Sequence, residues 1–128
     1  MIVVDTNVLA YLWLPGPRTS AAETLLRKDP DWHAPLLWRS EFRNVLVGQV
    51  RRRRLSLEAA GRIVTEAETQ MNGREYAVPS FEVLRRATES GCSAYDCEFI
   101  VLAETLAVPL YTSDEEVLAA FPSIARQL

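Results

Sequence analysis

The sequence predicts an α/β fold in which a short parallel sheet carries helices on both faces. Short apolar runs rich in β-branched residues alternate with longer segments whose apolar residues recur at helical spacing, a pattern typical of βαβ units. The chain has 128 residues, 48% hydrophobic and 24% charged, which suits a folded protein and excludes a disordered one. No linker or repeat divides it, so residues 1–128 are expected to form one domain.

Four strands are expected from the short apolar runs, which are too brief for helices. The first run ends at Asp5, and the last is followed by the polar segment Thr112–Asp114. The expected strands are Met1–Val4, Trp32–Ala34, Glu75–Val78 and Val108–Tyr111.

Seven helices are expected between and after these strands. Pro15-Gly16-Pro17 ends the first, Asn72-Gly73 forms a turn after the fourth, and Gly91 ends the fifth, because glycine and proline interrupt helices. The segment that begins at Ser93 is the most apolar of them. The expected helices are Val8–Leu14, Thr19–Lys28, Leu36–Arg54, Ser56–Gln70, Ser80–Ser90, Ser93–Leu106 and Glu115–Ala120.

Composition excludes several kinds of protein. The only cysteines, Cys92 and Cys97, and the single histidine, His33, have neither disulfide-framework nor zinc-site spacing, so a reducing cytoplasm is expected. Asp5 interrupts the apolar N-terminus, and no targeting segment is expected. The longest uncharged run, Thr6–Pro17, is shorter than the ~20 residues of a membrane span. No membrane partner is therefore expected.

Four carboxylates occupy positions that predict a site. Asp5 ends the first strand and Asp114 follows the last one, so both are expected at the carboxyl edge of the sheet, where parallel sheets hold their ligands. Glu41 and Asp96 fall on the apolar faces of their helices. A carboxylate on an apolar face is costly unless it is paired or holds a metal ion.

Each of these acids also has a purely structural interpretation. Asp5, Asp96 and Asp114 each stand at a helix start, where capping is common. Glu41 could pair with Arg39 or Arg43. Without such partners the four would repel, because two charges about 5 Å apart cost roughly 3 kcal/mol at an effective dielectric near 20. Four converging acids therefore predict bound Mg²⁺ or Mn²⁺, which prefer oxygen ligands.

The same segments resemble the acidic motifs of PIN-domain nucleases. The opening Ile2–Leu9 is similar to their first motif and Ser40–Leu46 to their second. Ser93–Asp96, continuing to Leu102–Glu104, resembles the third, and Thr112–Asp114 the fourth. The resemblance runs from end to end, and within the family it is strongest to VapC-type toxins of toxin–antitoxin pairs.

The resemblance implies a three-layer α/β/α sandwich and metal-dependent endonucleolytic cleavage of RNA. It assigns Asp5 and Asp96 as principal metal ligands and Glu41 and Asp114 as the acids that bind through water or activate it. It also implies homodimerisation and a cognate antitoxin as partner. Polar residues that orient the acids match three positions, Thr6, Asn7 and Thr112. Glu115 and Glu116, directly after Asp114, leave open which acid completes the site.

The basic residues gather in one part of the chain. Segment 39–62 holds seven of the 14 basic residues, whereas the net charge of the whole chain is −3. They predict phosphate contacts beside the acids, or else a solvated helix end that suits the helix dipole. The predicted RNA-binding residues are Arg43, Arg51, Arg52, Arg53 and Arg54.

Three other functions fit parts of the pattern. A PIN-fold nuclease of RNA processing would need no antitoxin, and a non-catalytic RNA-binding or scaffold domain would need no complete acid set. Phosphoryl transfer through an aspartyl phosphate, as in receiver domains and haloacid-dehalogenase-like phosphatases, needs a lysine near the phosphate. The only lysine, Lys28, lies in a predicted helix away from any strand end, which argues against that class.

Overall fold

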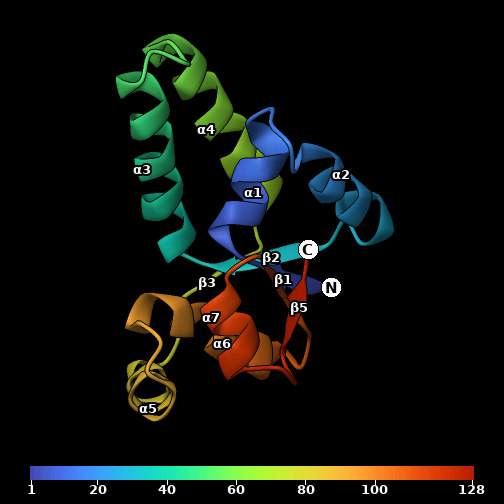
Figure 1. Ribbon diagram of the computed structural model, residues 1–128, viewed down its shortest axis with the longest axis vertical. Helices are drawn as coiled ribbons and strands as arrows, with labels where there is room; N and C mark the ends of the chain where they lie inside the picture. The colour runs from blue at the N-terminus through green and yellow to red at the C-terminus, as the bar shows by residue number, and fades with distance from the viewer.

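The computed structural model describes residues 1–128 and has a five-stranded sheet at its centre (Figure 1). The strands lie in the order β3-β2-β1-β4-β5, and every neighbouring pair is parallel. Because all strands run in one direction, their carboxyl ends share one edge of the sheet. The strands are β1 (Ile2–Val4), β2 (Trp32–Pro35), β3 (Glu75–Tyr76), β4 (Leu110–Thr112) and β5 (Ala125–Gln127).

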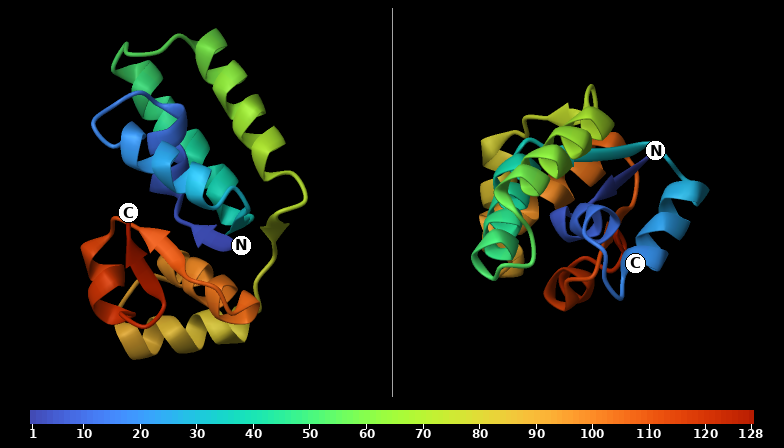
Figure 2. Two further views of the ribbon diagram at one scale, coloured as in Figure 1. Left: turned by 90° about the vertical axis from the view of Figure 1, so that its right-hand side faces the viewer. Right: turned by 90° about the horizontal axis from the view of Figure 1, so that it is seen from above.

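Helices cover both faces of this sheet and confirm the predicted three-layer α/β/α sandwich (Figures 1 and 2). One layer contains α1 (Thr6–Trp13), α2 (Thr19–Lys28), α3 (Leu37–Arg51) and α4 (Leu57–Met71). The opposite face carries α6 (Ala94–Leu106), with α5 (Ser80–Ser90) packed on its outer side and α7 (Glu115–Ala120) beside β5. The hairpin of α3 and α4 extends well beyond the sheet (Figure 1).

The core explains why the shortest elements form where they do. All three residues of β1 are buried, since β1 lies between β2 and β4 with helices on both sides. In α6, residues on several sides of the helix are buried, among them Cys97, Phe99 and Leu102. This helix lies between the sheet and α5, which explains why its sequence is the most apolar. No helix in the structure combines the length and apolarity that crossing a membrane requires.

The structure corrects several predicted elements: α3 ends at Arg51 and not at Arg54, and β3 ends at Tyr76 and not at Val78. Helix α1 begins at Thr6, directly after Asp5, and not at Val8. The fourth strand is Leu110–Thr112, so Asp114 follows it by two residues. The fifth strand, Ala125–Gln127, was not predicted; it pairs with β4 through Leu110 and Ala125. A three-residue edge strand with two exposed polar residues has no periodic pattern in the sequence.

Ala107 ends α6 in a left-handed conformation, with φ of 56°. This conformation costs an L-residue roughly 1 kcal/mol, and glycine adopts it freely. We expect Ala107→Gly to raise the free energy of unfolding by about 0.5–1 kcal/mol in urea titrations. Ala21→Gly, at an exposed position inside α2, should lower it by a similar amount. Equal losses in both variants would contradict the left-handed end of α6.

Candidate active site

Asp5 lies at the carboxyl end of β1, and its carboxylate faces β4. Thr112, which is fully buried at the end of β4, donates a hydrogen bond from Oγ1 to Asp5 Oδ2 at 2.8 Å. Asp5 occupies the N-cap position of α1, but its side chain makes no capping hydrogen bond. The capping interpretation of Asp5 is therefore wrong, and its carboxylate is directed across the sheet.

Asp114 is linked to Asp5 through the same threonine. Its backbone N–H donates to Thr112 Oγ1 at 3.0 Å. Its Oδ1 caps α7 by accepting from the N–H groups of Glu116 and Val117 at 2.9 and 3.1 Å, so the capping interpretation is correct here. Between these residues, Ser113 has a buried Oγ with no hydrogen-bond partner. Sequence reasoning did not single out this serine as a site residue.

Glu41 enters the site from the first part of α3. Thr6 of α1, which is buried, donates a hydrogen bond from Oγ1 to Glu41 Oε1 at 2.7 Å. Neither arginine considered as its partner reaches it: Arg39 pairs with Glu75 and Glu68, and Arg43 with Glu68. Glu41 therefore has a neutral hydrogen-bond donor and no cation.

Asp96 reaches the site from the first turn of α6, on the opposite face of the sheet from α3. Ser93 caps this helix by accepting the backbone N–H of Asp96 at 3.0 Å. Burial raises the pKa of the Asp96 carboxyl and hydrogen bonding with Ser93 lowers it, so the predicted cap involves both residues. The carboxylate of Asp96 is half-buried and makes no ion pair.

The four acids lie close enough for their charges to affect one another. Burial raises the pKa of Asp5, and the hydrogen bond from Thr112 offsets part of the rise. Burial also raises the pKa of Glu41 and of Asp96. Asp96 and Asp114 repel Asp5, Asp5 and Asp96 repel Glu41, and Asp114 repels Asp96. None of the four is paired with a cation.

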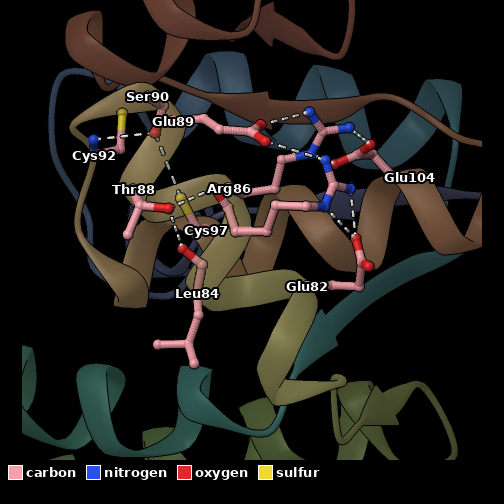
Figure 3. A network of polar contacts seen from close by, with 10 residues as sticks. Glu82, Leu84, Arg86, Thr88, Glu89, Ser90, Cys92, Cys97 and Glu104 are labelled. Carbon is pink, nitrogen blue, oxygen red and sulfur yellow. Dashed lines mark hydrogen bonds and ion pairs between the residues drawn. The ribbon is translucent and has the colours of Figure 1, made fainter.

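Glu98 is a fifth acid near the site, which the sequence pattern did not single out. Burial raises its pKa, and its charge raises the pKa of Glu41. It was missed because the first turns of α6 have neighbours on both sides, so helical phase alone does not separate site from solvent. In the sequence, Glu98 is the only charged residue between Asp96 and Glu104. This isolated charge in an apolar segment was the signal that could have identified it. Glu104 itself is paired with Arg86 of α5 (Figure 3).

Other predicted residues lie outside the acid cluster. Asn7 is exposed and hydrogen-bonds none of the acids; its side chain lines a pocket between α1 and α3. Arg43 pairs with Glu68 at 3.7 Å. The arginine segment 51–54 is at the end of α3 away from the sheet (Figure 1), about 15 Å beyond Glu41 at 1.5 Å per helical residue. These arginines make no ion pair with the acids, and their role in RNA binding stays a prediction.

The chemistry of the donors fits a hard divalent cation. Three partly buried carboxylates with raised pKa and no counter-charge are a costly arrangement that such a cation would relieve. No three acidic, histidine or cysteine side chains stand in a geometry that would hold a metal ion as they are. Mg²⁺ needs no such cage, because proteins bind it through one or two carboxylates and several waters.

Comparison with known proteins matches this architecture. A model of the PIN domain family matches residues 2–124. The chain is similar to Ribonuclease VapC3 of Pyrobaculum aerophilum, with 26% identity over 126 residues and 96% of both chains covered. A solved structure from Pyrobaculum aerophilum has a TM-score of 0.78 at 25% identity, covering 98% of this chain and 89% of that one.

Two further solved structures are alike in fold. FitAcB from Neisseria gonorrhoeae has a TM-score of 0.73, and a toxin–antitoxin complex from Klebsiella pneumoniae has 0.71. Both are 17% identical and cover 98% of this chain and 96% of their own. The family model spans nearly the whole chain, which confirms the resemblance seen in the sequence: this chain belongs to the PIN domain family.

Proposed function

We propose that this protein is a metal-dependent endoribonuclease, the toxin of a toxin–antitoxin pair, which hydrolyses RNA at the cluster of Asp5, Glu41, Asp96 and Asp114. The observation that carries the proposal is the gathering of these acids without any paired cation. Family membership supports nuclease chemistry, and the similarity to a protein named Ribonuclease VapC3 supports RNA as the substrate.

The four acids divide into two roles in this proposal. Asp5 and Asp96 would hold Mg²⁺ or Mn²⁺, which, when bound, supplies an activated water and stabilises charge on the phosphoryl group. Glu41, whose pKa is raised by burial, is a stronger base than an exposed glutamate and is suited to accept a proton from water. Asp114 Oδ2 remains free for the site because the cap of α7 uses Oδ1.

The threonines fix the directions of these carboxylates. Thr112 donates to Asp5, and Thr6 donates to Glu41. Outer residues of this kind orient metal ligands, and their loss commonly costs 10–100-fold in affinity or activity. Since both threonines are buried on the sheet edge, the acids keep their orientation before substrate arrives.

A cleavage assay tests the proposal. Purified protein should cleave single-stranded RNA at internal positions with Mg²⁺ or Mn²⁺, and excess EDTA should abolish cleavage. Glu23→Gln, which removes an exposed acid of α2 that makes no ion pair, should cleave normally. Cleavage that is undiminished in EDTA would overturn the metal-dependent mechanism. Tight RNA binding without turnover in any divalent metal would favour the scaffold alternative.

We also propose that a cognate antitoxin protein binds this chain. The similarity to a structure described as a toxin–antitoxin complex supports it. The product of a small adjacent reading frame, co-purified with this chain, should inhibit RNA cleavage. Cleavage without any such inhibitor would favour a PIN nuclease of RNA processing. Both thiols are free in the structure, and we place the activity in the cytoplasm with its RNA substrate.

We also infer that the chain forms a homodimer. Exposed apolar side chains lie at the starts of α3, α5 and α6, and Leu36 and Leu84 line one pocket of about 440 Å³. Large exposed apolar side chains that share a surface commonly mark a protein interface. Light scattering should give a dimer mass, and Leu84→Glu should give the monomer mass. A monomer in the unmodified chain would overturn this inference.

A further inference from the structure

A second pocket adjoins the acid cluster, between α1, α3 and the turn that follows α3. Its volume is about 510 Å³. Asn7, two residues after Asp5, and Val45, one helical turn after Glu41, form the wall nearest the acids. Sites for small molecules and cofactors commonly have volumes of 300–1,000 Å³. The pocket therefore has room for one nucleotide, and its lining residues Asn7 and Val45 are two residues from Asp5 and one helical turn from Glu41.

The polar atoms on the side chains of this pocket make no hydrogen bond or ion pair within the protein. Asn7, Tyr11, Gln49 and Arg54 all line it, and none makes a side-chain hydrogen bond or ion pair. Their polar atoms are also not among the buried unsatisfied ones, so they reach solvent. Two amides, a phenol and a guanidinium are thus directed toward one space, and together they offer both donors and acceptors.

The turn after α3 explains how Arg54 joins this group. The N–H of Arg54 donates to the carbonyl of Gln49, and that of Arg53 donates to Val50, both at 3.0 Å. Arg53 has a left-handed φ of 57°, as a helix end of this type requires. The chain thereby folds back, and Arg54 lies beside Gln49 instead of continuing away from the sheet.

Tyr11 is positioned by a cation on its ring. The guanidinium carbon of Arg18 lies over the ring, 5.1 Å from its centroid. Neither Arg18 nor Arg54 is paired with a carboxylate. Cation–π contacts at exposed sites orient aromatic rings with a modest energy. The pocket thus combines a fixed aromatic ring with unneutralised positive charge.

We propose that this pocket binds one nucleotide of the RNA strand beside the cleaved bond, with its base against Tyr11, its edge on Asn7 and Gln49, and a phosphate on Arg54. The inference deepens the proposed function and rests on it. Sequence-selective proteins recognise single-stranded RNA by stacking bases on aromatic rings and hydrogen-bonding their edges. An unpaired arginine is suited to phosphate. The pocket would therefore set the sequence preference of cleavage.

The charges nearby favour a nucleotide over a peptide segment. No carboxylate lines the pocket, and Arg54 is its only charged residue, so a basic peptide would be repelled there. An acidic peptide would meet the four carboxylates next to it. A nucleotide places its phosphate on Arg54 and its uncharged base toward Asn7. The next part of the RNA strand, which carries the bond to be cleaved, then lies at the acids.

An NMR titration tests the pocket without requiring cleavage. Nucleoside 5′-monophosphates, added to the full chain without metal, should shift the side-chain amide signals of Asn7 and Gln49. The amide of Gln70, which lines a separate pocket, is the internal control. Ribose 5-phosphate should shift these amides far less. Equal shifts with ribose 5-phosphate, or no shift with any nucleotide, would overturn base binding.

Binding and cleavage variants test the same pocket on RNA. In an Asp5→Asn background, Tyr11→Leu should weaken binding of a short single-stranded RNA about tenfold. Arg54→Ala should lower the slope of log affinity against log salt by about 0.7. Arg62→Ala is the charge-matched control, because Arg62 is an exposed and unpaired arginine of α4. At low salt it should lower the affinity for RNA less than Arg54→Ala does.

Sequence preference gives the sharpest result. On a randomised RNA pool, Gln49→Ala should lose the base preference at one position beside the cut and retain it elsewhere. Unchanged preference and affinity in Gln49→Ala and Tyr11→Leu, with circular dichroism showing both folded, would overturn the inference while the nuclease proposal stands. If the unmodified chain neither binds nor cleaves RNA, the proposed function fails, and the nucleotide titration still decides the pocket.

Discussion

Asp5→Asn should abolish RNA cleavage and at the same time stabilise the metal-free protein at pH 7. The asparagine oxygen can still accept the hydrogen bond from Thr112, so the fold keeps this contact. Burial raises the pKa of Asp5, which means that the folded state disfavours its charge. Removing that charge raises the free energy of unfolding, whereas losing a metal ligand should cost more than about 100-fold in cleavage rate.

Asp96→Asn should behave in the same way, because burial raises the pKa of Asp96 as well. Cleavage rates and urea unfolding of both variants check the expectation, with Glu23→Gln as the conservative control. A variant that loses activity and stability together would only show damage to the fold. If Asp5→Asn instead cleaves RNA within a few-fold of the unmodified chain, Asp5 is not a ligand of the catalytic metal.

Raising the pH should lower the stability of the metal-free protein, whereas binding of Mg²⁺ should raise it. In EDTA, the free energy of unfolding should fall as pH rises above about 4, the pKa of these acids in the unfolded chain. The four acids with raised pKa, Asp5, Glu41, Asp96 and Glu98, keep their protons in the folded state at pH values where the unfolded chain, with pKa values near 4, has lost them. The folded state then binds more protons, so raising the pH favours unfolding.

The acids with lowered pKa do not obscure this trend. Asp29, Asp31 and Glu75 have pKa values below their ordinary ones, so the stability that they contribute is lost only in acid, as pH falls through those low values. Between pH 5 and 7 they are charged in both states. The double variant Asp5→Asn/Asp96→Asn should therefore show a flatter dependence on pH, which isolates the contribution of the cluster.

Mg²⁺ should restore the stability that the metal-free protein loses at pH 7. At 100 times its dissociation constant, an ion that binds only the folded state adds about 2.7 kcal/mol, which is about 10 °C in a melting temperature for a chain of this size. The gain should shrink at pH 5, because protons compete for the same carboxylates. Thermal melts with and without Mg²⁺ measure it. Equal stabilisation of the double variant would place the metal elsewhere.

The sequence was a good guide to the site wherever a carboxylate's position depended on a regular element. Asp5 and Asp114 follow strands, and parallel strands end at a common edge. Glu41 and Asp96 fall on apolar helix faces, and the structure gives all four acids a charged neighbour from the same set. Their roles as ligands remain predictions, but their proximity follows from strand ends and helical periodicity.

Alternatives that depended on side-chain partners could not be decided from the sequence. Capping applies to Asp114 and fails for Asp5, although both precede helices. The arginines near Glu41 along the chain instead pair with Glu68 and Glu75, residues of α4 and β3. Each choice depends on which element packs nearby, and no local pattern contains that information.

The sequence alone determined the fold class, because alternating apolar runs can bury their surface only as a parallel sheet between two layers of helices. Only the tertiary structure decided that the charge of Glu98 acts on Glu41, that α3 ends away from the sheet, and that Arg54 folds back beside Gln49. These placements depend on contacts between residues far apart in the chain and on one left-handed turn. Periodicity specifies which residues are buried, whereas packing determines which polar groups meet.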